Sequence, residues 1–110
     1  MFSEETMQQL FVERIFKIDG QNVACRFYRP TQDGTDFSCR YTINLLGKPK
    51  ERHSYGVDAI QALLLAMKKA HIELLLLRDQ KGLRVEWLNE ENLGLPLDEE
   101  FRDLSSKNSY

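Results

Sequence analysis

Residues 58–78 read DAIQALLLAMKKAHIELLLLR, the strongest structural signal in the sequence. Its apolar residues recur at the spacing of an α-helix, which predicts a helix from Asp58 to about Arg78. Asp58 can cap the amino end, with Gln61 completing a capping box, and Gly82 ends the helix at the latest. Such a helix is roughly 30 Å long. Ten residues share the face that we expect to be buried: Ala59, Ile60, Leu63, Leu64, Ala66, Met67, Ala70, His71, Leu74 and Leu75.

The sequence before this helix alternates apolar and polar residues, as half-buried strands do. Residues 37–45 (FSCRYTINL) give the clearest strand, and residues 23–29 give a second, ended by Pro30. A further strand is predicted from about Leu10, and a short one over 51–55. Strands of eight to ten residues match the length of the helix, so one helix can cover one face of the sheet.

The first strand has two possible readings at its start. Leu10, Val12, Phe16 and Ile18 alternate as inward residues, with Arg14 as the exception, while residues 4–10 fit a short helix as well. A turn at Asp19-Gly20 then leads into the second strand, because Gly20 accepts the positive φ of a tight hairpin.

The next hairpin has a predictable register. Pairing Val23 with Tyr41, Cys25 with Cys39 and Phe27 with Phe37 sets apolar residues opposite one another, with residues 29–35 as the loop. We expect five residues to share one core: Leu63, Met67, Trp87, Phe37 and Tyr41.

The predicted fold is therefore α+β, with an antiparallel sheet of four to five strands and one long helix across one face. A short strand at 83–88 and a helical turn at 98–104 follow the helix. The 110 residues suit a single domain, residues 1–110, with an irregular or helical start at 1–9 and a frayed tail at 105–110.

Composition excludes some classes of function. The chain has 15 Lys and Arg against 17 Asp and Glu, a net charge of −2 that does not suit a generally basic nucleic-acid binder. Its apolar runs, such as Ala62–Met67 and Leu74–Leu77, are too short to span a membrane. An acidic amino terminus argues against a signal peptide, and two cysteines fit a reducing compartment, so we expect a cytoplasmic protein.

Residues Tyr55–Leu63 (YGVDAIQAL), followed by Leu65-Ala66, resemble the signature of a family of small bacterial proteins of unknown function. Trp87-Leu88, Gly94-Leu95-Pro96 and the Cys39-x-Tyr41 strand add to the resemblance, which covers roughly residues 15–96. It implies strands before the helix and a bacterial origin, and it brings no established activity.

Some residue types in this sequence can act in catalysis or bind metals, but their arrangement favours structural roles. Cys25, Cys39, His53 and His71 form no CxxC, HxxxH or HExxH motif, so we expect no metal and no cofactor. The two cysteines are read as reduced core residues on neighbouring strands, and His71 as a packing residue. We therefore expect no enzymatic activity, while an enzyme with an unrecognised site stays an alternative.

Binding is the favoured class of function, in two forms. In the less favoured form, Arg26, Tyr28, Arg40 and Thr42 share the open face of the sheet and bind single-stranded nucleic acid. In the favoured form the chain binds a protein, because Leu65, Ile72 and Leu76 form an apolar stripe on the polar side of the helix.

The candidate protein interface joins that stripe to charged residues. Residues 79–110 are acidic, with a net charge of −4, and could occupy the basic active site of a toxin, as an immunity or antitoxin protein does. A second copy of the chain, or the chain's own C-terminal segment with Phe101 and Leu104, could cover the stripe instead. The candidate residues are Leu65, Lys68, Lys69, Ile72, Leu76, Glu90, Glu91, Asp98, Glu99 and Glu100.

Overall fold

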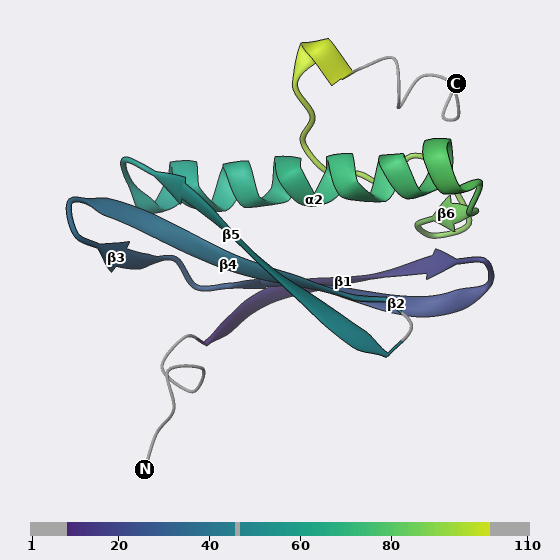
Figure 1. Cartoon of the computed structure of the whole chain (residues 1–110), viewed down its shortest axis with the longest axis horizontal. Helices are drawn as coiled ribbons and strands as arrows, with labels where there is room; N and C mark the ends of the chain where they lie inside the picture. Colours follow the sequence, from purple (N-terminus) through teal and green to yellow (C-terminus); the bar gives the residue numbers. More distant parts are fainter. Residues whose placement is uncertain (1–8, 46, 102–110) are drawn as a thin grey trace.

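The computed structural model describes residues 9–45 and 47–101, and it has two layers, a twisted antiparallel sheet and one long helix lying across it (Figure 1). The elements in chain order are β1 (Leu10–Ile18), β2 (Gln21–Tyr28), β3 (Thr31–Asp33), β4 (Asp36–Leu45), β5 (Lys48–Gly56), α2 (Ala59–Lys81), β6 (Val85–Glu86) and the 3₁₀ turn η1 (Glu99–Phe101). This confirms the predicted α+β class.

The sheet runs in the order β5-β4-β2-β1-β6, and the short β3 continues the line of β2 along the same edge of β4. Strand β5 spans nine residues, longer than the predicted 51–55, and pairs with the full length of β4. Helix α2 packs mainly against β4 and β5 (Figure 1). The opposite face of the sheet carries no element of the described chain, so one face is core and the other is open.

The ends of α2 follow the predicted capping residues. The Asp58 side chain accepts a hydrogen bond from the Gln61 backbone N–H at 2.8 Å, and the Gln61 side chain accepts one from the Val57 N–H at 2.8 Å. Gly82, in the left-handed conformation at φ 67°, ends the helix three residues beyond Arg78. Both signals are local, which is why the sequence located them well.

The predicted buried face of α2 was partly wrong. Ile60 and Leu64 are exposed, while Ala62, absent from the prediction, is fully buried. The helix rests on the sheet through the small side chains of Ala62, Ala66 and Ala70. Its second buried flank, at His71 and Leu75, lies under the C-terminal segment, which bonds to the helix at Lys68, His71 and Arg78.

Strand β1 begins where predicted, but Leu10 and Val12 are exposed instead of buried. The pairing of β1 with β2 shifts between these two residues, which is the mark of a β-bulge at Phe11, and β6 covers β1 only at its last two residues. Arg14, the charged exception in the alternation, donates from Nη1 to the carbonyl oxygens of Leu93 and Gly94, both at 3.0 Å. Its guanidinium also stacks on Trp87.

The predicted register of β2 on β4 was wrong by four residues. Cys25 lies opposite Ile43, not Cys39, and Phe27 lies opposite Tyr41. The predicted loop contains β3, which closes a tighter turn by pairing Asp33 with Asp36. A shift of the strand pairing by four residues leaves every side chain on the same face of the sheet, so the alternation of apolar and polar residues could not reveal the error.

The core joins both layers, and the predicted core residues belong to it. Tyr41 is fully buried, and Leu63, Met67, Phe37 and Trp87 pack around it and its neighbours. After β6, residues 87–97 run back along α2, with Leu93 fully buried. The predictions for the start of the chain up to residue 8, the end of the 98–104 turn, Leu104 and the 105–110 tail lie outside the described residues.

Candidate functional site

The predicted helix stripe lies between the two buried flanks of α2. Leu65, Ile72 and Leu76 are each half-buried, and the described C-terminal segment runs along the other flank of the helix instead of over them. The predicted lysines beside the stripe bond within the chain: Lys68 pairs with Asp98 at 2.7 Å, and Lys69 donates to the His53 carbonyl oxygen at 3.0 Å.

The predicted acidic residues fall into two groups along α2. Glu90 and Glu91 lie near the carboxyl end of the helix, where Arg78 donates to the Glu91 carbonyl oxygen at 2.7 Å. Asp98 and Glu99 lie about three turns away, near Lys68, a separation of roughly 15 Å. The backbone of Glu100 belongs to η1, and its side chain lies outside the description. The structure therefore does not gather these acids into one continuous cluster.

Three of the four cysteines and histidines considered for metal binding or catalysis, Cys25, Cys39 and His71, are buried, while His53 is exposed. Burial raises the pKa of the Cys25 thiol to about 12 and that of the Cys39 thiol to about 11, so both stay protonated near neutral pH. Burial lowers the pKa of His71, whose Nδ1 lies 3.1 Å from the Pro96 carbonyl oxygen. All three side chains are buried, which is compatible with the packing role that the sequence predicts for them.

The buried thiols give a prediction about pH. Because the thiol pKa values are raised above the ordinary 9.0, an unfolded chain releases its thiol protons at a lower pH than the native chain does. The free energy of unfolding should therefore fall as pH rises through 9 toward 11–12, and it should fall less in a Cys25→Ala, Cys39→Ala variant. Equal reactivity of native and unfolded thiols toward a thiol reagent would contradict the buried placement.

The open face of the sheet brings together the four residues that the sequence assigned to it. Residues on neighbouring strands form a row across β1, β2, β4 and β5, because Glu13 lies opposite Arg26, Arg26 opposite Thr42, and Thr42 opposite Glu51. A hollow of about 420 Å³ opens over this row. It is lined by Arg26, Tyr28, Arg40, Thr42, Pro49 and Glu51.

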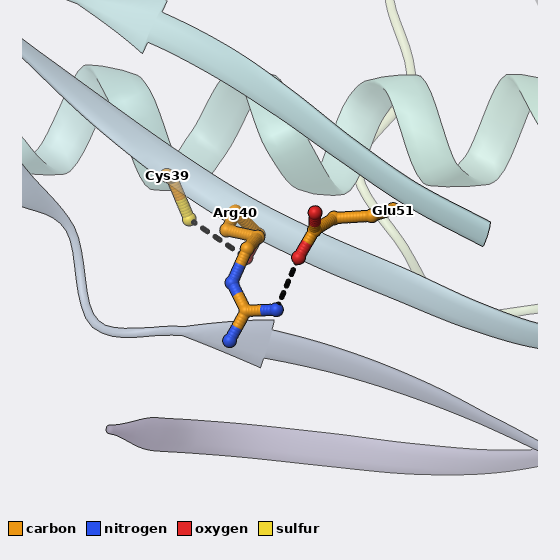
Figure 2. Close-up of polar contacts among 3 residues, drawn as sticks. All are labelled: Cys39, Arg40 and Glu51. Carbon is orange, nitrogen blue, oxygen red and sulfur yellow. Dashed lines mark hydrogen bonds and ion pairs between the residues drawn. The ribbon is translucent and has the colours of Figure 1, made fainter. Parts of the chain in front are cut away.

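Arg40 is the centre of this hollow. It is only 8% exposed although no described element covers it. Its guanidinium stacks on the Tyr28 ring at 3.8 Å and forms an ion pair with Glu51, which reaches across from β5 (Figure 2). The neighbouring side chain of Arg26 pairs with Glu13 at 3.0 Å. Residues of β1, β2 and β5 therefore position the two arginine side chains through contacts within the chain itself.

The charges around this hollow indicate which kind of partner it could bind. Arg26 pairs with Glu13 and Arg40 pairs with Glu51, so the charges of these four side chains balance. A fixed guanidinium beside an aromatic ring is a composition that protein interfaces favour. The hollow is thus a preformed surface of balanced charge.

Two exposed aliphatic residues of the open face were not predicted from the sequence. Leu10 lies opposite Tyr28 and Ile15 opposite Ala24, so both belong to the open face, and they are 50% and 45% exposed. Leu10 was predicted to lie in the core. No sequence pattern indicated that Ile15 is exposed, because the exposure of a strand residue depends on what covers the sheet.

Within the ranges that the structure covers, no three His, Cys, Asp or Glu side chains gather as a metal site would require. No helix in those ranges has the length and apolar character needed to cross a membrane.

Together, the two-layer fold and the open charged face define a small α+β domain. Residues 12–97 match the family described as a domain of unknown function (DUF6968), and the chain belongs to that family. This agrees with the expected kind of family, while the role of Tyr55–Leu63 as its signature stays a prediction. No curated protein and no solved structure matches the chain.

Proposed function

We propose that this protein is a non-catalytic module that binds another protein through the open face of its sheet. The observation that carries the proposal is the pair of exposed aliphatic residues, Leu10 and Ile15, beside the hollow that holds Arg40 and Tyr28. Exposed apolar residues around a preformed arginine and tyrosine make a typical binding hot spot. The two thiols in the chain are free, which fits the expected cytoplasmic location.

The charge pattern favours a protein over single-stranded nucleic acid. A nucleic-acid partner would need Arg26 and Arg40 to leave Glu13 and Glu51, and both carboxylates would then repel its phosphates. A protein can meet each guanidinium–carboxylate pair with groups of both charges, and its apolar side chains can pack on Leu10 and Ile15. The proposed partner surface therefore carries groups of both charges opposite the hollow and apolar side chains opposite Leu10 and Ile15.

The variants Ile15→Glu and Tyr28→Ala test this surface. We expect either change to weaken binding by at least about tenfold, since truncating an anchor at an interface centre costs about 2 kcal/mol or more. The partner would be identified by cross-linking the full chain in cells that naturally express it. Binding of the purified pair would then be measured by titration calorimetry.

Three results would contradict this proposal and point to another surface or another kind of partner. Ile72→Glu, on the helix stripe, is the matched control, and a loss of binding in that variant alone would move the interface to α2. Self-association measured by sedimentation, abolished by Ile72→Glu, would identify a second copy as the partner. Salt-dependent binding of a poly-U oligonucleotide, lost in Tyr28→Ala, would support the nucleic-acid alternative.

A toxin-neutralising role that uses the acidic residues is an alternative to binding through the open face. Glu90, Glu91 and Glu99 are exposed and could enter a basic active site. In this form Glu90→Lys, Glu91→Lys abolishes binding while Ile15→Glu has no effect, and the partner is encoded beside this protein's gene.

A further inference from the structure

A second cavity lies on the other side of the sheet, between the last turns of α2 and strands β4 and β5. Its volume is about 170 Å³. The walls are aliphatic, with Ile43 and Leu45 from β4 and Leu76 and Leu77 from α2. Leu76 belongs to the predicted helix stripe, so part of that stripe forms a cavity wall.

The mouth of the cavity carries an excess of positive charge. Glu73 is already engaged, because it accepts a hydrogen bond from the Tyr41 hydroxyl at 2.5 Å and pairs with Arg52 at 3.3 Å. Lys50 and Lys81 also line the cavity, and neither forms an ion pair with any residue that the structure describes. The carboxyl end of α2 adds a partial negative charge there, which two lysines outweigh.

The size of the cavity limits what its apolar part can hold. An apolar cavity of about 150 Å³ accommodates a benzene molecule, so this one fits a chain of roughly six to eight carbons. A charged head on such a chain would remain at the mouth, where the lysine side chains can reach it.

We propose that this cavity binds a small amphipathic anion, a monocarboxylate with a short aliphatic chain. The chain lies among Ile43, Leu45, Leu76 and Leu77, and the carboxylate lies between Lys50 and Lys81. The site is on the opposite face of the sheet from the proposed protein interface, so either proposal can fail without the other.

Octanoate is the probe, titrated into the ¹⁵N-labelled full chain and followed by NMR. We expect saturable shifts of the backbone amides around Leu45 and residues 76–81, with a Kd in the range of about 0.1–1 mM. The uncharged 1-octanol should bind more weakly. Lys50→Glu, Lys81→Glu should weaken octanoate binding by roughly tenfold and leave octanol unchanged.

The control variant Lys17→Glu, Arg29→Glu makes the same change in net charge away from the cavity and should leave the octanoate affinity unchanged. Leu76→Gln should weaken both ligands, since it places a polar group in the wall. Absent shifts at 5 mM (about five times the upper Kd estimate), or shifts located elsewhere, would overturn the proposal. Equal affinity for octanol and octanoate would overturn the assignment of an anion.

Discussion

Replacing Leu74 by alanine is expected to lower the free energy of unfolding by about 2–5 kcal/mol, among the largest effects of any single change in this chain. The Leu74 side chain is fully buried where α2 meets the core. Alanine would leave a cavity that the closely packed side chains around it cannot close. Equilibrium unfolding in urea, monitored by circular dichroism, measures the loss.

Leu64 provides the matched control for this prediction. It lies in the same helix and was predicted to share the buried face with Leu74, but it is 38% exposed. We expect Leu64→Ala to cost less than about 1 kcal/mol. Equal losses in the two variants would show that the helix is rotated relative to the described structure.

The change Gly56→Ala should destabilise the chain by about 1–3 kcal/mol or more, because it forces two elements apart. Gly56 ends β5 next to the first turn of α2. A β-carbon there would lie 2.5 Å from the Ala62 backbone nitrogen and 2.8 Å from the Gln61 β-carbon. Neither neighbour is the flexible end of a side chain, so the start of the helix must move.

Hydrogen exchange distinguishes this steric effect from ordinary glycine strain. Gly34→Ala is the control, since its position has open space around it but a positive φ of 67°, which costs about 1–2 kcal/mol by itself. Gly56→Ala should speed amide exchange over residues 61–65, and Gly34→Ala should not. Unchanged exchange at the start of α2 in the Gly56 variant would contradict the close contact.

The resemblance to a known family drew attention to this same strand-to-helix junction. In the structure Gly56 allows close approach, and Asp58 and Gln61 cap the helix two residues later. The capping pattern could be read from the sequence because its bonds span at most four residues. The need for glycine could not, since φ at Gly56 is not in the positive range and the contact depends on how the helix docks.

Most elements of this fold could be located from the sequence alone, with β3 as the exception. Alternation located β1, β2 and β4, the turn pair Asp19-Gly20 joined the first two, and the spacing of apolar residues gave α2 with its ends. These signals are local, because a strand's faces and a helix's caps depend on residues a few positions apart. The open-face set of Arg26, Tyr28, Arg40 and Thr42 followed from the same alternation.

Tertiary contacts set the register of β2 on β4, the exposure of Leu10 and Leu64, and the burial of Arg40. Strand β3 resets the pairing, a bulge at Phe11 places Leu10 opposite Tyr28, and Tyr28 with Glu51 encloses the Arg40 guanidinium. Periodicity shows which side chains share a face. What covers that face depends on how distant segments pack, and that packing produced both candidate sites.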